Sequence, residues 1–370
     1  MSGRTTILRP PPDDPNKSEI ENVLEVTELG VLGPDIFTNA RPAWTPPGAR
    51  GIFGGLVIAQ SLAAAQRTVH SGTELPPFFM HSCHCYFLLA GSSDVPILFH
   101  VERVRDGRSF ATRTVQARQR GRCIFTVTVS FVREGAGGEK AARHAAPLPA
   151  GVTPPAADDA AFEEPWMGMG PFQARPTDIV DADGKSLADA VAEGSHADGR
   201  EHEMKARMWT RARGTISPEG GHDAHLIALA YVSDSYFIGT VSRVHRLWKF
   251  PFEPSAVASM DPERKELIRR LHHFDGIGGD IEDAAHWDSR PKLGMVVSLD
   301  HSIYFHEPRR IKADEWMFCE METPWAGDGR GVVNQRIFAA DGTLLATCVQ
   351  EGVLRLKRDE EDDEKPSSKL

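Results

Sequence analysis

The feature that most constrains the fold of this chain is an internal repeat. A stretch in the first half, residues 81–132, shares a series of short motifs with a stretch in the second half, residues 298–353. In each, a short β-like run is followed by an Asp-Gly turn with arginine, then by a glycine turn and a long β-like run. Repeated units of this kind bury their apolar faces against each other. We therefore predict two related units with one architecture.

Polar residues occupy the inward positions of only one copy. Aligned on these motifs, the copies pair His84 with His301, His81 with Ser298, Gly121 with Gly342 and Val129 with Gln350. A duplicated unit that keeps its turns but changes a few inward positions commonly has one working half and one structural half. We expect the functional residues in the second half.

The composition is that of a globular protein with about two domains. The 370 residues are 41% hydrophobic and 25% charged, and the net charge of −10 argues against a general nucleic-acid binder. The five cysteines form no Cys-x-x-Cys pair, which indicates a reducing compartment. The N-terminus lacks the apolar core of a signal peptide, and no run of about 18 apolar residues predicts a membrane span.

Neither a metal site nor an α/β-hydrolase nucleophile is predicted. His81, Cys83 and Cys85 alternate and would share one strand face, but the spacing of zinc ligands differs. Small thiols in a core strand are the commoner arrangement. The Gly-x-Ser-x-Gly elbow of an α/β-hydrolase does not occur in the sequence.

The chain ends in Ser368-Lys369-Leu370, the three-residue peroxisomal address. This tripeptide closes a charged tail, residues 358–370, that has little reason to fold, so an import receptor could reach it. We predict a protein of the peroxisomal matrix whose import receptor binds the tripeptide.

Changes in composition divide the chain. We predict a first unit at residues 21–135, an Ala/Pro-rich linker region at 136–204, a second unit at 205–357 with an insertion at about 242–292, and the tail. Each unit contains a helix that is apolar on nearly every face, near 56–69 and 225–237, followed by short β-branched and aromatic runs. This pattern indicates an antiparallel sheet wrapped around a buried helix.

Five segments together resemble the acyl-CoA thioesterase II family. They are Arg50–Gly55, His81–Phe87, Arg105–Phe110, Leu299–His306 and Val349–Val353. The C-terminal tripeptide makes the chain similar to the fungal peroxisomal members. The resemblance implies an α+β fold, the double hotdog, in which two antiparallel sheets are each wrapped around a central helix.

The family hydrolyses acyl-CoA thioesters with an Asp, a Ser or Thr and a Gln that jointly hold a water, and the matching residues here are Asp234, Ser298 and Gln350. The residues themselves point the same way. Asp234 lies in an otherwise apolar helix and Gln350 in an apolar strand, where a polar group needs a partner. A carboxylate, a hydroxyl and an amide can orient a water toward a thioester carbonyl without a covalent intermediate.

Seven further residues are candidates for substrate binding: Gly54, Gly55, His81, His84, His301, Arg309 and Arg310. A backbone N–H at the Gly54-Gly55 turn would meet the thioester oxygen. His84 and His301 recur in both copies, which favours a structural or channel-lining position over catalysis. Arg309 and Arg310 either meet the phosphates of CoA or are solvated surface residues.

The resemblance therefore predicts an enzyme that splits fatty acyl-CoA into free fatty acid and CoA, without a metal or redox cofactor. The acyl chain would lie in the apolar seam between helix and sheet. Two alternatives stay open. A hotdog acyl-CoA hydratase would need an Asn-preceded Asp/His dyad, which neither helix carries, and the three polar residues argue against a non-catalytic acyl-CoA-binding protein. Exposed sheet edges would also allow a homo-oligomer, by analogy of fold.

Overall fold

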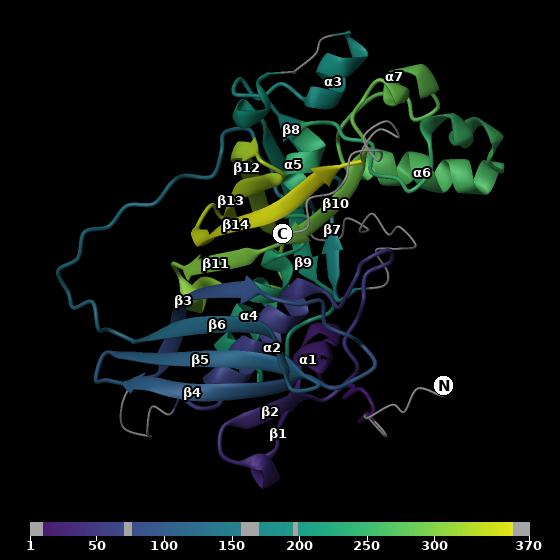
Figure 1. Cartoon of the computed structure of the whole chain (residues 1–370). Coiled ribbons are helices and arrows are strands. Elements are labelled where there is room, and N and C mark those ends of the chain that lie inside the picture. Colours follow the sequence, from purple (N-terminus) through teal and green to yellow (C-terminus); the bar gives the residue numbers. More distant parts are fainter. Residues whose placement is uncertain (1–9, 70–75, 157–169, 195–198, 358–370) are drawn as a thin grey trace, which may run out of the picture.

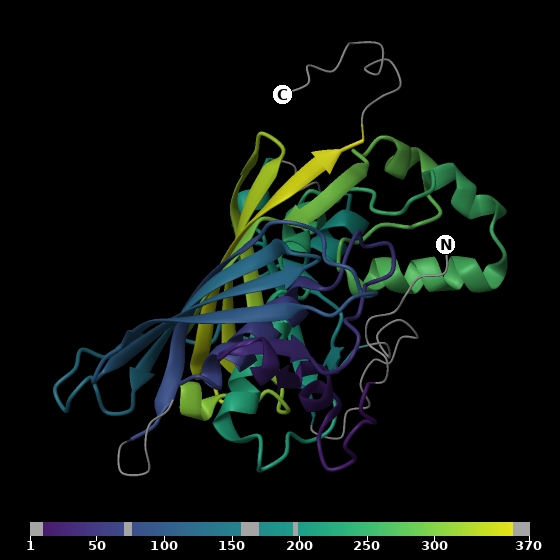
Figure 2. The same ribbon diagram turned by 60° about the horizontal axis from the view of Figure 1, so that its bottom comes forward.

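The computed structural model describes residues 10–69, 76–156, 170–194 and 199–357. The predicted import signal, Ser368–Leu370, lies outside these residues. A single large sheet runs through both halves of the chain, and helices α2 and α4 lie against one of its faces (Figure 1, Figure 2). No helix in the described part of the chain is long and apolar enough to cross a bilayer.

The named strands all pair antiparallel. The sheet order is β1-β2-β4-β5-β6-β3-β11-β14-β13-β12-β9-β7, and in addition β10 pairs with β14 and β8 with β9. The strands are β1 Val26–Glu28, β2 Ile36–Asn39, β3 Phe78–Phe87, β4 Leu98–Asp106, β5 Phe110–Gln119, β6 Arg122–Arg133, β7 Phe172–Ala174, β8 Asp178–Val180, β9 Lys205–Ala212, β10 Leu293–Ser298, β11 Asp300–Phe305, β12 Met317–Gly327, β13 Arg330–Ala339 and β14 Leu344–Leu356. The two sheets that we expected are one continuous sheet, because β3 and β11 hydrogen-bond to each other.

The predicted repeat is present in the strand order. In the first half, helix α2 (Gly54–Gln66) stands between β2 and β3 in the chain, and the sheet order is β2-β4-β5-β6-β3. In the second half, helix α4 (Gly221–Ser233) follows β9, and the sheet order is β9-β12-β13-β14-β11. Because the halves join through β3 and β11, these two series are symmetric about the junction.

The pairing registers correct our alignment of the two copies by one residue. Cys83 faces Val129 between β3 and β6, and the register between β11 and β14 runs on to bring His301 opposite Gln350. With Val129 matched to Gln350, the counterpart of His301 is Cys83 and not His84. Burial agrees, since Cys83 and His301 are fully buried whereas His84 is exposed. A slip of one residue turns a side chain to the opposite face of the sheet.

The counterpart of Ser298 in the first half changes in the same way. Met80 faces Phe131, and Ser298 faces Gly352, in the corresponding ladders. Phe131 and Gly352 each lie two residues beyond the matched pair on β6 and β14, so Met80 is the counterpart of Ser298. His81 instead occupies the irregularity that follows Met80, at the place where β10 passes into β11 in the second half.

Helices α2 and α4 pack against each other because both are apolar on nearly every face. Their approach is close: a Cβ on Gly55 would lie 2.2 Å from the backbone oxygen of Tyr231. Glycine is required at this crossing. The crossing brings the first turn of α2 next to the last turn of α4.

The region expected as a linker contributes to the sheet. β7 and β8 lie within 136–204 and both pair with β9, and helix α3 (Leu187–Ala192) follows them. The other short elements outside the insertion are α1 Glu19–Leu24, η1 Gly30–Leu32, η3 Glu201–Glu203 and η5 Pro308–Arg310. The second half of the sheet therefore begins earlier in the chain than residue 205.

The insertion places α6 (Pro262–Phe274) and α7 (Ala284–Asp288) at one end of the molecule, whereas α5 (Gly239–Val244) packs against β9, β12 and β13 (Figure 1). The insertion also contains η4 Pro254–Ser259. The buried Asp275 carboxylate holds it through ion pairs with Arg243 and Lys249. The glycine-rich turn after α6 has a packing reason, since a Cβ on Gly276 would lie 2.2 Å from the oxygen of Thr177.

Candidate active site

Three polar side chains from distant parts of the sequence meet at one carboxylate. Asp234 caps the C-terminus of α4, Ser298 ends β10 and Gln350 lies in the middle of β14. Gln350 Nε2 donates to Asp234 Oδ1 over 2.7 Å. The Ser298 side chain and the Gly55 N–H also hydrogen-bond the carboxylate. The structure thus brings together the three residues that the sequence singled out.

Glycines at the start of α2 let the N-terminus of this helix approach Asp234 closely. A Cβ on Gly54 would lie 2.6 Å from Asp234 Oδ2 and 2.8 Å from the ring of Phe87. The N-terminus of a helix carries partial positive charge and free N–H groups, which favour a carboxylate. The Gly55 N–H hydrogen-bonds Asp234. A backbone N–H of the Gly54-Gly55 turn as the partner of the thioester oxygen stays a prediction.

Burial raises the pKa of Asp234 to about 6, and hydrogen bonds from Gln350, Gly55 and Ser298 act in the opposite direction. A carboxyl group with this pKa is mostly ionised at neutral pH, yet it binds a proton more readily than an exposed aspartate does. This is the property required of a general base.

A second pair of polar side chains lies behind Gln350. His301 Nδ1 is 3.1 Å from Gln350 Nε2, and His301 Nε2 is 3.0 Å from Ser233 Oγ. Burial lowers the pKa of His301 to about 3, so its imidazole is neutral. From the sequence we expected His301 to be a binding residue, and we did not predict Ser233. The signal available for Ser233 was a hydroxyl directly before Asp234 in an otherwise apolar helix.

The other two candidate histidines are not brought to this carboxylate. His84 is exposed and its Nδ1 lies 2.9 Å from Ser302 Oγ. His81 Nε2 lies 2.8 Å from Ser130 Oγ. The partners of both histidines alternate with the inward residues of their strands, so both imidazoles belong to the outer face of the sheet.

Arg309 and Arg310 lie apart from the carboxylate as well. They belong to η5, beyond the C-terminal end of β11, whereas Ser298 precedes the start of that strand. Arg309 forms an ion pair with Glu134 and Arg310 with Asp341. In the part of the chain that the structure describes, His, Cys, Asp and Glu side chains form no group of three or more that could hold a metal ion.

A cavity of about 210 Å³ opens beside the C-terminal turn of α4. Much of its wall is aromatic and comes from Trp44, Phe53, Phe172, Tyr231 and Tyr236. The rings of Phe172 and Tyr231 are stacked, and Phe53 meets Tyr231 edge-on. Phe53 directly precedes the glycine turn, and Tyr231 lies one helical turn before Asp234. The cavity is therefore an apolar space next to the polar cluster.

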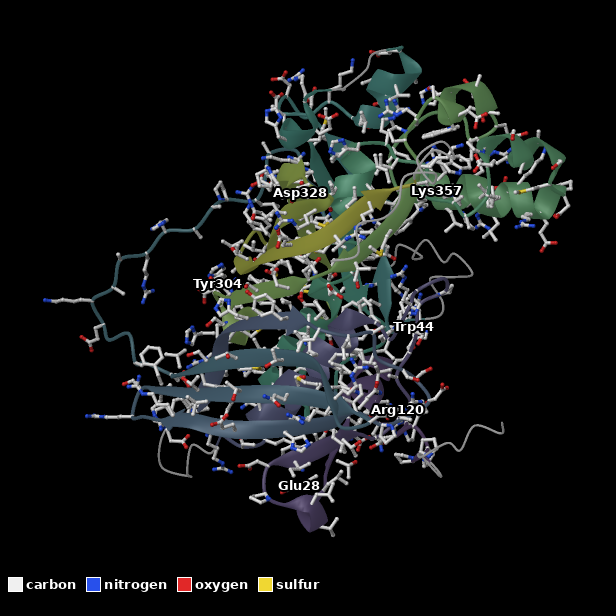
Figure 3. All side chains as sticks on the ribbon, in the orientation of Figure 1. Glu28, Trp44, Arg120, Tyr304, Asp328 and Lys357 are labelled. Atoms are coloured by element: carbon white, nitrogen blue, oxygen red, sulfur yellow. The ribbon has the colours of Figure 1, made fainter. Side chains whose placement is uncertain are left out.

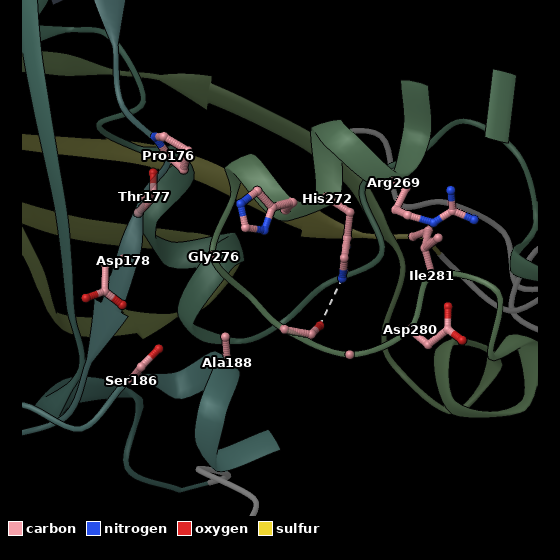
Figure 4. Close-up of a pocket in the computed structure, with 13 residues that line it drawn as sticks. Pro176, Thr177, Asp178, Ser186, Ala188, Arg269, His272, Gly276, Asp280 and Ile281 are labelled. Atoms are coloured by element: carbon pink, nitrogen blue, oxygen red, sulfur yellow. Dashed lines mark hydrogen bonds between the residues drawn. The ribbon is translucent and has the colours of Figure 1, made fainter. Parts of the chain in front are cut away.

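A different cavity, of about 460 Å³, lies between the insertion and β8 (Figure 4). Two of its polar side chains already have partners: Arg269 pairs with Glu266 and Glu282, and His272 hydrogen-bonds the oxygen of Gly278. Thr177 Oγ1, also in its lining, is buried without a hydrogen-bond partner among the described residues. Asp234, Ser298 and Gln350 line neither this cavity nor the aromatic one, but the aromatic one is lined by Val232 and Ser235, next to Asp234 in the chain. We place the candidate site at Asp234 because Gln350 and Ser298 converge on its carboxylate. Figure 3 shows the side chains of the described residues on the ribbon.

Two family models match the chain. The model of the acyl-CoA thioesterase N-terminal domain matches residues 41–132, and that of the acyl-CoA thioesterase C-terminal domain matches residues 150–354. The chain belongs to the acyl-CoA thioesterase II family. It is therefore a hydrolase of acyl-CoA thioesters, and its two matched regions correspond to the two halves of the sheet.

Individual relatives agree with this assignment. The chain is 33% identical to acyl-coenzyme A thioesterase 8 of Mus musculus over 90% of this chain and 89% of that protein. It is 24% identical to the peroxisomal acyl-coenzyme A thioester hydrolase 1 of Saccharomyces cerevisiae over 91% of this chain and 95% of that one.

Solved structures show the same architecture. An acyl-CoA thioesterase II from Mycobacterium marinum, 28% identical, superposes with a TM-score of 0.58 over 91% of this chain and 97% of that chain. A hot dog fold protein from Alicyclobacillus acidocaldarius, 16% identical, has a TM-score of 0.56 over 92% of this chain and 98% of that chain. The fold is thus of the hotdog type, with a large antiparallel sheet.

Proposed function

We propose that this family member hydrolyses fatty acyl-CoA to free fatty acid and CoA through a water held by Asp234, Ser298 and Gln350, in a double-hotdog fold. The observation that carries the proposal is the convergence of the Gln350 amide, the Ser298 side chain and a helix N-terminus on the Asp234 carboxylate. The three donors fix the direction of the carboxylate, and its burial raises its affinity for a proton.

The chemistry follows from these groups. Asp234 accepts a proton from the water while the water oxygen attacks the thioester carbonyl carbon. Ser298 and Gln350 fix the direction of the water. The carbon–sulfur bond then breaks, the acid leaves with the new oxygen, and the CoA sulfur takes a proton from Asp234, which returns the carboxylate to its starting form. No covalent acyl-enzyme is needed.

The aromatic cavity next to Asp234 is the proposed site of the acyl chain. It offers the apolar wall that a hydrocarbon chain requires, and Phe53 and Tyr231 lead from it to the carboxylate. The anionic CoA would remain nearer to solvent, where its phosphates keep their hydration.

The test is a free-thiol assay with acyl-CoA of several chain lengths, combined with mass analysis of the products. Asp234→Ala, Ser298→Ala and Gln350→Ala should each lower kcat by about 10²-fold or more, and double variants should lose little beyond the single ones. Val129→Ala, at the matching position of the first half, should leave kcat largely unchanged. With enoyl-CoA as a further substrate, formation of hydroxyacyl-CoA without free thiol would instead identify a hydratase, and binding without product would identify an acyl-CoA-binding protein.

We further propose that the protein works in the peroxisomal matrix. Two facts support this location: the terminal Ser368-Lys369-Leu370 and the peroxisomal relative in yeast at 24% identity. A chain that lacks the last three residues should remain cytosolic with unchanged activity when no full-length copy is present. Import of the truncated chain into peroxisomes would show that another segment carries the address.

A further inference from the structure

The amide nitrogen of Gln350 uses both of its hydrogens inside the protein. It donates one to Asp234 Oδ1 at 2.7 Å and faces His301 Nδ1 at 3.1 Å. The Gln350 side chain is fully buried, and its Oε1 has no hydrogen-bond partner among the described residues. An amide carries two donors on nitrogen and two lone pairs on oxygen. Its orientation thus leaves one free acceptor, the Oε1 atom, for a water or a substrate group.

His301 can accept from Gln350 in only one of its neutral tautomers. Nδ1 must be unprotonated, so the proton must lie on Nε2. Ser233 supplies the partner for that proton: its hydroxyl donates to the oxygen of Ala230 at 2.9 Å and therefore offers a lone pair to His301 Nε2 at 3.0 Å. Every donor in this chain of hydrogen bonds then meets an acceptor.

We propose that His301 is a positioning residue, which fixes the Gln350 amide with its oxygen free, and that Ser233 sets the His301 tautomer. With the opposite tautomer, the Nδ1–H of His301 would face the N–H of Gln350, and the amide would lose its defined direction. The inference rests on the proposed function of Gln350 and adds two residues to the machinery that holds the water.

The asymmetry between the two halves supports this assignment independently. The register places Cys83 and Val129 in the first half where His301 and Gln350 stand in the second, and both are buried and apolar. The histidine and the amide are thus present together in one half and absent together from the other. A histidine that served only to fill the core would not need to occur in the same half as the Gln350 amide.

The test compares two amide substitutions. In His301→Asn the side-chain oxygen can take the place of Nδ1 and accept from Gln350, whereas in His301→Gln the amide reaches the place of Nε2 and the acceptor is lost. We expect His301→Asn to keep kcat within about 10-fold of the wild type. We expect His301→Gln to lower kcat by about 10²-fold, because misplacing a catalytic group by about 1 Å has this effect. KM should stay within about threefold in both.

Three further measurements separate positioning from mere packing. The double variant His301→Gln with Gln350→Ala should be no slower than Gln350→Ala alone, because both changes remove the same interaction. Ser233→Ala should lower kcat by about 10-fold, and it disturbs the fold less than a change at His301. The control is His306→Asn, an exposed histidine on the same side of the sheet junction whose Nε2 meets Thr347 Oγ1 at 2.8 Å; its kcat should not change.

Nuclear magnetic resonance of ¹⁵N-histidine-labelled protein reads the tautomer directly, with His301→Asn to assign the signal. We expect a protonated Nε2 and an unprotonated Nδ1 at neutral pH, and a mixture of tautomers in Ser233→Ala. A protonated Nδ1 in the wild type, or equal kcat in His301→Asn and His301→Gln, would overturn the inference. If Gln350→Ala itself has wild-type kcat, the proposed function fails, whereas a slow Gln350→Ala beside a fast His301→Gln overturns the positioning residue alone.

Discussion

At the scale of single residues, the properties of the site follow from burying one carboxylate among apolar side chains and then surrounding it with donors. Water is lost from around Asp234 as α4 packs, and this loss raises its pKa. Hydrogen bonds from Gln350, Gly55 and Ser298 partly replace the lost water. They stabilise the ionised carboxylate and fix its direction. The result is a carboxyl group with a pKa of about 6, which suits the base that we propose.

This pKa predicts the pH dependence of activity. Only the ionised carboxylate can accept a proton, so kcat/KM should rise with pH through an apparent pKa of about 6 and then level off. A pH–rate profile with a short acyl-CoA measures it. A flat profile between pH 5 and 7, in protein that stays folded over this range, would contradict the assignment of Asp234 as the base.

The same shift predicts the pH dependence of stability. The folded-state pKa of Asp234 is raised above the unfolded value of 3.8. The stability that this shift contributes to the folded state is therefore fully present below pH 3.8 and is lost as the pH rises through about 6. Relative to Asp234→Asn, the wild type should lose on the order of 3 kcal/mol of unfolding free energy between pH 4 and pH 7. Urea titrations of both proteins at several pH values measure the difference.

At the scale of helices and strands, the crossing of α2 over α4 builds the site. Gly54→Ala would place a Cβ 2.6 Å from Asp234 Oδ2 and 2.8 Å from Phe87. We expect a loss of about 1–3 kcal/mol in unfolding free energy, together with a fall in kcat, because the carboxylate must move. Gly137→Ala is the matched control, since a Cβ there has nothing within 4 Å. Unchanged kcat in Gly54→Ala would show that the approach of α2 is not needed.

The strand β7 supplies one aromatic wall of the cavity beside Asp234. Phe172→Ala should enlarge this cavity and remove the ring stacked on Tyr231. We expect kcat/KM to fall more for acyl chains that fill the cavity than for acetyl-CoA, so the preference for chain length shifts. Phe110→Ala, on the outer face, serves as the control. An equal change for all chain lengths would place the acyl chain elsewhere.

At the scale of the whole molecule, the two halves form one folding and functional unit. β3 pairs with β11 across the junction, and the Gly55 N–H of the first half bonds the Asp234 carboxylate of the second. A fragment that starts at residue 141 should therefore be inactive and poorly folded alone. Co-expression with residues 1–140 should restore free-thiol release, which a pull-down and the assay together would measure. Activity in the isolated second half would show that it completes its own site.

Much of this arrangement could be predicted from the sequence because local patterns carry it. Short β-branched and aromatic runs predicted an antiparallel sheet in each half, and the apolar runs predicted both central helices, α2 and α4. The unusual polar residues of these runs, Asp234 and Gln350, pointed to the site, since a buried polar group needs a partner. These signals depend on neighbours within one helix or strand, so the chain alone determines them.

What the tertiary structure decided depends on contacts between distant segments. The registers of β3 against β6 and of β11 against β14 showed that Cys83, and not His84, matches His301, because a one-residue slip reverses the face of a side chain. No pattern in the sequence could predict the hydrogen-bond partner of the Gly55 N–H or the hydrogen bond between Ser233 and His301. Hydrogen-bond partners are chosen by position and direction in space, and only the packing of α2, α4 and the sheet sets these.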